Sequence, residues 1–152
     1  LTADDLPFGV TDIRSWESVG DPSALVIGSK AHPGSVVPRS RLRAVMSWGY
    51  RFLRRVILGM TVGDCQGTLF VNRTWLQRHI PLLREHGYLA STEIVHLAQV
   101  DRRRVVEVPV VLQAGHERGG TRIRIADVWD MAVGLIRLRR RRHMLRVALK
   151  ES

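Results

Sequence analysis

Three short segments between residues 26 and 70 combine the residue types that bind negatively charged ligands. They are Gly28-Ser29-Lys30, the group Arg39, Arg43 and Ser47, and Asp64-Cys65-Gln66-Gly67. Because Arg43 and Ser47 are four residues apart, they fall on one face of a helix, and Arg39 stands one turn earlier. Guanidinium groups, a hydroxyl and helix N-terminal amides suit the acceptor oxygens of a phosphate. The pattern predicts an anion-binding site, although spacing alone also fits an amphipathic helix with a solvated basic face.

Acidic residues supply a second kind of chemistry. Asp4 and Asp5 stand at a predicted strand-to-loop transition, and Asp64 opens a polar loop that ends at a glycine. Hard carboxylate oxygens of this kind suit a divalent cation that bridges a diphosphate. Without further context, both acidic segments also fit simple turns. Glu93 and Glu107 lie in apolar surroundings, where Glu107 is equally typical of an ion-pair partner between elements.

The clearest element is a helix over Ser40–Leu58, which has to position the basic and hydroxyl groups. Apolar residues recur there at three- and four-residue steps, which predicts one buried face. That face comprises Leu42, Val45, Met46, Gly49, Phe52, Leu53, Val56 and Ile57. The opposite, solvated face is expected to carry Arg43, Ser47 and Arg54, and Gly59 ends the helix.

The remaining elements follow from caps, breakers and short apolar runs. We expect strands over Ala24–Ile27, Thr68–Val71 and Val105–Leu112, and helices over Thr11–Ser18, from Asn72 to about His86, over Ser91–Val100 and from Ile123 to about Leu145. Pro109 restricts its strand to an edge or a terminal position.

The length of 152 residues fits one domain with a real core. The hydrophobic content is 45%, yet no apolar run approaches the length of a transmembrane helix. Cys65 is the single cysteine, so an internal disulfide is excluded. The chain starts at Leu1, directly on the Asp4-Asp5 turn.

The net charge of +10 is concentrated at the end of the chain. Residues 137–152 hold seven Lys or Arg and one Glu, and without them the net charge is +4. We therefore divide the chain into residues 1–136, the main body, and residues 137–152, a basic amphipathic helical tail. Such a tail favours an anionic membrane surface or a nucleic acid, or is simply solvated.

In their order along the chain, these segments resemble family 2 glycosyltransferases that load a sugar onto a polyprenyl phosphate, and most closely the dolichyl-phosphate glucosyltransferase branch. The family's Asp-x-Asp-Leu turn corresponds to Ala3-Asp4-Asp5-Leu6, and its Gly-Ser-Arg corresponds to Gly28-Ser29-Lys30. Its Asp-Thr-Gln-Cys-Gly-Phe corresponds to Asp64–Gly67 with one residue fewer, and its Gly-x-Ser-Lys to Gly119–Arg122. Ala3 replaces the first carboxylate and Lys30 replaces an arginine, so chelation and bidentate binding are both weakened.

The resemblance implies an α/β fold in which residues 1–136 are the C-terminal part of a GT-A catalytic domain, a Rossmann-like mixed sheet flanked by helices. It therefore implies that the chain is a C-terminal fragment of a longer enzyme. It implies an inverting enzyme that transfers a sugar, with glucose from UDP-glucose as the branch expectation, from a nucleotide sugar to a polyprenyl or dolichyl phosphate. The implied cofactor is Mg²⁺ or Mn²⁺. The implied location is peripheral, on the cytoplasmic face of an anionic membrane, with no nucleic acid as partner, and the fragment alone is expected to be inactive.

The resemblance also assigns roles to residues. Asp64 and Glu93 are implied catalytic carboxylates. Lys30, Asp4 and Asp5 are implied at the nucleotide-sugar diphosphate, with Asp5 and Asp4 as metal ligands. The acceptor phosphate is implied to contact Arg39, Arg43, Ser47, Arg118, Thr121 and Arg122. Gly67 is implied to allow a close backbone approach.

Two alternatives stay open. The same arginines fit a basic module that binds nucleic acid, but an aromatic content of 6% offers little surface for base stacking. An inactive relative of the glycosyltransferases is also consistent with Ala3.

Overall fold

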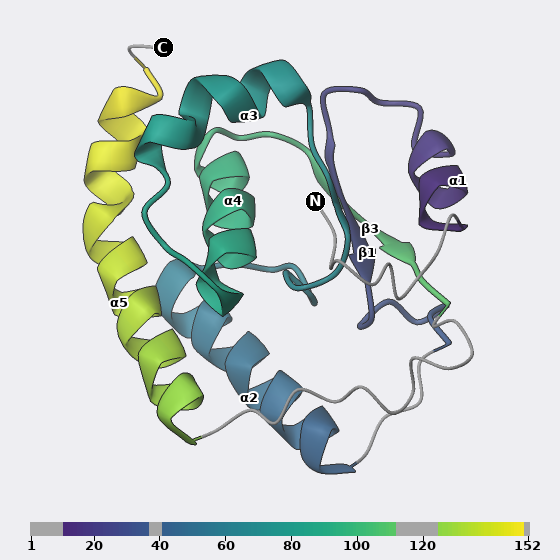
Figure 1. The fold of residues 1–152 in the computed structure, drawn as a ribbon, viewed down its shortest axis with the longest axis horizontal. Helices are drawn as coiled ribbons and strands as arrows, with labels where there is room; N and C mark the ends of the chain where they lie inside the picture. Colours follow the sequence, from purple (N-terminus) through teal and green to yellow (C-terminus); the bar gives the residue numbers. More distant parts are fainter. Residues whose placement is uncertain (1–10, 37–40, 112–124, 151–152) are drawn as a thin grey trace.

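Strand β1 (Leu25–Ser29) is the centre of the fold, because all five of its residues are buried and both of its edges are paired. The computed structural model describes residues 11–36, 41–111 and 125–150, with the backbone alone for 11–12, 41–43 and 125–128. β1 pairs antiparallel with β2 (Leu69–Phe70) and parallel with β3 (Val105–Pro109), which gives the order β2-β1-β3. The chain is therefore an α/β protein with a small mixed sheet, as predicted (Figure 1).

The two faces of the sheet are covered by different helices. Leu25 and Ile27 lie in the main core together with side chains of α4 (Tyr88–Val100) and α5 (Ile125–Ala148). Val26 belongs to a smaller cluster on the other face, where Trp16 of α1 (Thr11–Glu17) stacks on Phe70 at 5.6 Å. Side chains of a strand alternate between its faces, so β1 contributes to both cores. Figure 1 shows α1 on one side of the sheet and α4 and α5 on the other.

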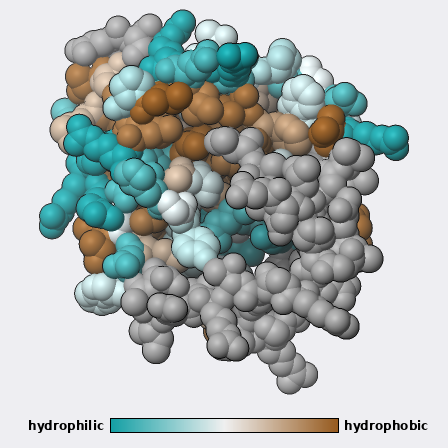
Figure 2. All heavy atoms as spheres, viewed as in Figure 1, coloured by the Kyte–Doolittle hydropathy of each residue, from teal (hydrophilic) through white to brown (hydrophobic). Residues whose placement is uncertain are grey.

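The surface mixes both kinds of side chain. On the face drawn in Figure 2, hydrophobic residues lie directly beside strongly hydrophilic ones. Within the described part of the chain, no helix combines the length and the apolar character needed to span a bilayer.

The predicted helix from Asn72 to about His86 is wrong in its second half. α3 (Arg73–His79) ends early, at His79, and a single 3₁₀ turn, η1 (Ile80–Leu82), follows. Pro81 lies in that turn; proline lacks the N–H of an α-helix and its ring clashes with the preceding turn. Gly87, with φ 56°, then precedes α4, which starts at Tyr88 rather than at Ser91.

Other boundaries agree more closely with the sequence. Asn72 caps α3 as predicted, because its side-chain oxygen accepts a hydrogen bond from the Trp75 N–H at 2.9 Å. Pro109 is the last residue of an edge strand, also as predicted. β3 stops before Leu112, but Val111 still forms an isolated bridge with Val36.

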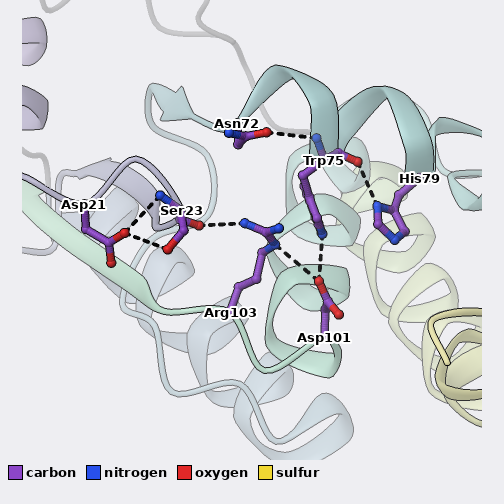
Figure 3. Close-up of polar contacts among 7 residues, drawn as sticks. All are labelled: Asp21, Ser23, Asn72, Trp75, His79, Asp101 and Arg103. Carbon is purple, nitrogen blue, oxygen red and sulfur yellow. Dashed lines mark hydrogen bonds and ion pairs between the residues drawn. The ribbon is translucent and has the colours of Figure 1, made fainter. Parts of the chain in front are cut away.

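A polar network ties the beginnings of β1 and β3 to α3 (Figure 3). The Trp75 indole N–H donates to Asp101 at 2.7 Å, and Arg103 contacts the same carboxylate at 3.2 Å. Arg103 also donates to the Ser23 carbonyl oxygen at 2.8 Å. A cavity of about 260 Å³ opens beside this network, lined by Pro22, Ser23, Asn72, Thr74, Trp75, Arg78 and Arg103. No residue of the predicted site lines it.

Helix α2 (Arg41–Leu58) reverses the predicted orientation of its faces. Val45, Phe52 and Val56, expected inside, are 65%, 53% and 59% exposed. Arg54, expected in solvent, is 2% exposed. The apolar spacing located the helix correctly but not its buried side, because the buried side is set by the polar contacts of Arg54 described below.

Gly67 lies against the carbonyl oxygen of Gly28, so the predicted close backbone approach is confirmed. The Gly28 N–H donates to the Thr68 carbonyl oxygen at 2.8 Å, and a Cβ built at Gly67 would overlap the Gly28 carbonyl. A substitution there has to displace backbone rather than a flexible side chain.

We predict that Gly67→Ala lowers the free energy of unfolding by about 1–3 kcal/mol, because the added methyl group forces backbone apart. Gly49→Ala is the matched control: it lies inside α2 with nothing within 4 Å of the new Cβ, and it should stabilise the protein by about 0.5–1 kcal/mol. Urea denaturation measures both values. Equal stability of the two variants would contradict the close approach.

His96 is a buried ionisable group inside α4. It is 1% exposed, and neither ring nitrogen has a hydrogen-bond partner. Burial, followed by the positive charges of Arg142 and Arg146, lowers its pKa to about 4, and only Glu93 opposes this shift. The imidazole is therefore neutral in the folded protein at neutral pH.

Because the folded pKa lies below the unfolded value, the unfolded chain binds the proton first and stability falls as the pH decreases from about 6.5 to about 4. We predict that His96 lowers the free energy of unfolding by about 2 kcal/mol when the pH falls from about 7 to about 5. His96→Leu should remove that part of the pH dependence, whereas His86→Leu, at an exposed position, should leave it unchanged. Denaturation at the two pH values provides the measurement, and an unaltered slope in His96→Leu would refute the assignment.

Candidate functional site

The loop over residues 63–67 lies at the carboxyl end of β1 and brings two predicted site residues together. One oxygen of the Asp64 carboxylate accepts the backbone N–H of Lys30 at 3.0 Å. The other oxygen accepts the N–H of Gln66 at 2.9 Å and closes a local turn. The acidic loop and the Gly-Ser-Lys segment, 34 residues apart in sequence, therefore form one site.

Glu107 holds this loop in place from the neighbouring strand. Its two carboxylate oxygens accept the backbone N–H groups of Gly63 at 2.8 Å and Asp64 at 3.1 Å. The parallel register of β3 sets Glu107 opposite Ile27, two residues before the end of β1. A Cβ at Gly63 would lie 2.9 Å from the Ala31 side chain and 3.2 Å from the Glu107 carboxylate, so the loop packs tightly on both.

The sequence analysis did not predict this positioning role of Glu107. It considered Glu107 only as an ion-pair partner between elements. The available signal was an acidic residue in the middle of an apolar strand that pairs with β1. A partly buried carboxylate in such a place requires donors, and loop N–H groups supply them.

Two arginines of α2 hold the same loop from the opposite side. Arg51 and Arg54 both donate to the Gly63 carbonyl oxygen, at 3.1 Å and 3.0 Å. Arg54 also contacts the Cys65 sulfur and lies over the Tyr50 ring at 5.2 Å. Their positive charges oppose the negative charges of Asp64 and Glu107, which makes the half-buried cluster electrostatically tolerable.

Cys65 does not act as a nucleophile in this arrangement. Burial raises the pKa of its thiol to about 12, and the nearby Arg54 only partly opposes that effect. Since the thiolate is the reactive form, the side chain remains an inert, buried thiol at neutral pH. Its position inside the loop instead fixes packing between α2 and the sheet.

Two predicted acceptor positions, 43 and 47, fall on the side of α2 that carries Arg51. Ser47 is exposed and lies one helical turn before Arg51, which contacts the loop. Position 43 falls on the same face by helical periodicity, but the Arg43 side chain is outside the described atoms. The backbone thus sets positions 43 and 47 toward the loop side of the helix.

Glu93 lies in the interior, in a separate network. It is 1% exposed, and one oxygen accepts the N–H groups of Arg84 at 2.8 Å and Glu85 at 2.7 Å. Its other oxygen binds Arg141 at 2.8 Å, and Arg141 also donates to the Leu82 carbonyl oxygen at 2.5 Å. These contacts give Glu93 a structural role between α4 and α5, and its implied catalytic role stays a prediction.

The predicted basic tail is part of the folded body. α5 continues through residues 136 and 137 without interruption, and Leu138 and Leu145 are buried in the main core. Arg137 pairs with Glu85 at 3.1 Å, and Arg139 donates to the Ile57 carbonyl oxygen at 2.6 Å. The domain boundary placed at residue 136 has no counterpart in the course of this helix.

The other predicted site residues lie outside the described residues. They are Asp4, Asp5, Arg39, Arg118, Thr121 and Arg122. Both predicted metal ligands, Asp4 and Asp5, are among them. Within residues 11–36, 41–111 and 125–150, no group of three or more His, Cys, Asp or Glu side chains could hold a metal ion.

Comparison with known proteins finds a similarity to a glycosyltransferase. The chain is 30% identical over 121 residues to the dolichyl-phosphate beta-glucosyltransferase of Saccharomyces cerevisiae. The aligned region covers 76% of this chain and 35% of the relative. No protein-family model matches the chain. No solved structure matches it either. The chain therefore spans about a third of the length of this relative, and the similarity supports a distant relationship to the glycosyltransferases.

Proposed function

We propose that this chain is the C-terminal part of an inverting GT-A glycosyltransferase that moves a sugar from a nucleotide sugar to a polyprenyl or dolichyl phosphate. The observation that carries the proposal is the contact between the Asp64 carboxylate and the Lys30 N–H at the carboxyl end of β1. Ligands of α/β sheets bind beyond the carboxyl ends of the strands, so this contact lies where a substrate site is expected. The similarity to a dolichyl-phosphate beta-glucosyltransferase makes glucose the favoured sugar.

The proposed reaction is a displacement at the anomeric carbon. An oxygen of the lipid phosphate forms the new bond to that carbon, and the bond to the nucleoside diphosphate breaks, with inversion. Because the attacking oxygen is already anionic, no strong general base is needed. The protein has to hold two negatively charged groups close together, for which oriented cations and loop dipoles are the appropriate means.

In this proposal, Lys30 contributes positive charge at the donor diphosphate and Asp64 lies beside the reacting groups. Glu107, Arg51 and Arg54 hold the Asp64 loop. The acceptor phosphate is assigned to the loop side of α2 at positions 43 and 47, together with Arg39, Arg118, Thr121 and Arg122.

Mg²⁺ or Mn²⁺, bound by Asp5 and Asp4, is proposed as the cofactor. The described residues alone do not form a metal site. Since the relative is about three times as long as the matched region, we propose that the chain is inactive without the remainder of the enzyme.

The proposed location is the cytoplasmic face of a membrane, where the lipid substrate would be found. The exposed arginines of α5, among them Arg139, Arg140 and Arg146, support attraction to an anionic surface. Two other arginines of the tail, Arg137 and Arg141, are paired with Glu85 and Glu93, so fewer charges are available than the composition suggests.

We predict that, in the full-length enzyme, Arg43→Ala lowers kcat/KM for sugar transfer to a polyprenyl phosphate by about 100-fold or more, through loss of a charge-assisted phosphate contact. Asp5→Ala should cause a comparable loss in the presence of Mg²⁺ or Mn²⁺. Arg55→Ala is the matched control, because this arginine lies on the same helix and is exposed. Turnover that is unchanged in both site variants would remove the assignment.

Glu107→Gln tests the loop itself. The amide oxygen can still accept one loop N–H, but the amide NH₂ group replaces the second oxygen and faces the other N–H, donor against donor. We therefore predict a loss of about 1–3 kcal/mol in the free energy of unfolding. Transfer activity should fall even at temperatures where the variant is fully folded. Glu17→Gln, at an exposed position of α1, should change neither quantity. A folded Glu107→Gln enzyme with wild-type activity would show that the loop's position is irrelevant to the reaction.

A further inference from the structure

The chain leaves β1 at Ser29 and returns to the sheet at Val36, after an excursion over residues 30–34. The register between β1 and β3 ends at Ser29. Val36 then forms a parallel bridge with Val111, and its N–H donates to the Val110 carbonyl oxygen at 3.0 Å. The pairing with β3 is therefore resumed beyond the excursion, and residues 30–34 form a loop whose two ends lie together at the sheet.

One hydroxyl group closes this loop at its base. Ser35 Oγ donates a hydrogen bond to the Ser29 carbonyl oxygen at 2.6 Å and accepts the Val110 N–H at 3.0 Å. Val110 is 1% exposed, and a buried N–H that loses its acceptor is costly. A single side chain thus joins the end of β1, the returning chain and the continuation of β3.

The loop closed by Ser35 carries the residue that the proposed function assigns to the nucleotide-sugar diphosphate. That residue, Lys30, donates its backbone N–H to the Asp64 carboxylate at 3.0 Å. The next residue, Ala31, packs closely on the acidic loop, because a Cβ at Gly63 would lie 2.9 Å from its side chain. The closed conformation of the loop therefore sets Lys30 and the acidic loop in their relative positions.

We propose that Ser35 is a positioning residue for the nucleotide-sugar diphosphate and acts through Lys30. By closing the loop over residues 30–34 before a substrate binds, it removes the free-energy cost of ordering that loop during binding. The inference rests on the proposed function, because that function assigns Lys30 to the diphosphate. The acceptor positions 43 and 47 lie on α2, a separate element, so the effect of Ser35 is specific to the sugar donor.

The test compares serine variants of the full-length enzyme. Ser35→Ala should raise the KM for the nucleotide sugar about tenfold, because the substrate then has to order the loop, and should leave the KM for the polyprenyl phosphate within about twofold. Ser35→Thr keeps the hydroxyl and should restore the wild-type value. Ser18→Ala is the matched control, because the Ser18 hydroxyl also donates to a backbone carbonyl oxygen, that of Ser15 at 2.7 Å, but lies beside α1.

Two further measurements distinguish positioning from a general loss of stability. Ser35→Cys fills nearly the same space with a weak hydrogen-bonding group, so it should fold and show the same selective rise in KM to a smaller degree. In a Lys30→Ala background, Ser35→Ala should have little further effect on the KM for the nucleotide sugar. Amide hydrogen exchange over residues 29–36 should be faster in Ser35→Ala than in the wild type and in Ser35→Thr.

An unchanged KM for the nucleotide sugar in folded Ser35→Ala would overturn the inference. So would an equal rise in both KM values, since that result identifies a general structural effect. Calorimetric titration with UDP and Mg²⁺ separates this inference from the proposed function, because it requires no transfer. Sugar transfer by the wild type, with a UDP affinity that Ser35→Ala leaves unaltered, rejects the role of Ser35 alone. A UDP affinity that depends on Ser35, without any transfer, rejects the transferase alone.

Discussion

The bidentate hydrogen bonding of the Glu107 carboxylate to the backbone N–H groups of Gly63 and Asp64 is the interaction on which the rest of the site depends. The strand that carries Glu107 pairs with β1, so the same register that builds the sheet delivers a carboxylate to two loop N–H groups. Without it, the N–H groups of Gly63 and Asp64 would be partly buried without partners, at a cost of about 1–3 kcal/mol each. The loop is therefore specified by sheet pairing rather than by its own sequence.

The same loop explains why α2 turns as it does. The Gly63 carbonyl oxygen receives hydrogen bonds from Arg51 and Arg54, and these contacts fix the inward side of the helix. Once Arg54 points inward, the residues half a turn away, Trp48 and Phe52 among them, have to point outward. A polar requirement at the loop thus determines the apolar character of a distant surface.

These relations show what could be predicted from the sequence and what could not. Local signals placed the helices and strands well, because caps, breakers and periodicity act over a few residues, as at Asn72 and Pro109. They missed the early end of α3 at His79, which is followed by a 3₁₀ turn that contains Pro81. There a breaker lies inside an otherwise helical pattern. The burial of Arg54 and the exposure of Val45, Phe52 and Val56 were beyond reach, since periodicity finds an apolar face but not which part of it the protein covers.

The candidate site divides in the same manner. The nearness of Asp64 to Lys30 agrees with the shared site that the family resemblance implied, and Gly67 allows the close backbone approach that it also implied. The roles of Glu107 and Glu93 depend on partners 43 and 48 residues away, and no local pattern reveals them. Long-range pairing is the information that a single sequence contains least visibly.

The course of α5 has one further consequence. Because Leu138 and Leu145 are anchored in the core, and Arg137 and Arg141 are paired with Glu85 and Glu93, the arginines left exposed occupy set positions on a rigid rod. Their electric field consequently has a direction, unlike the diffuse field of a flexible basic arm. An approaching anionic body would experience a torque as well as an attraction, and would meet the molecule in a preferred orientation.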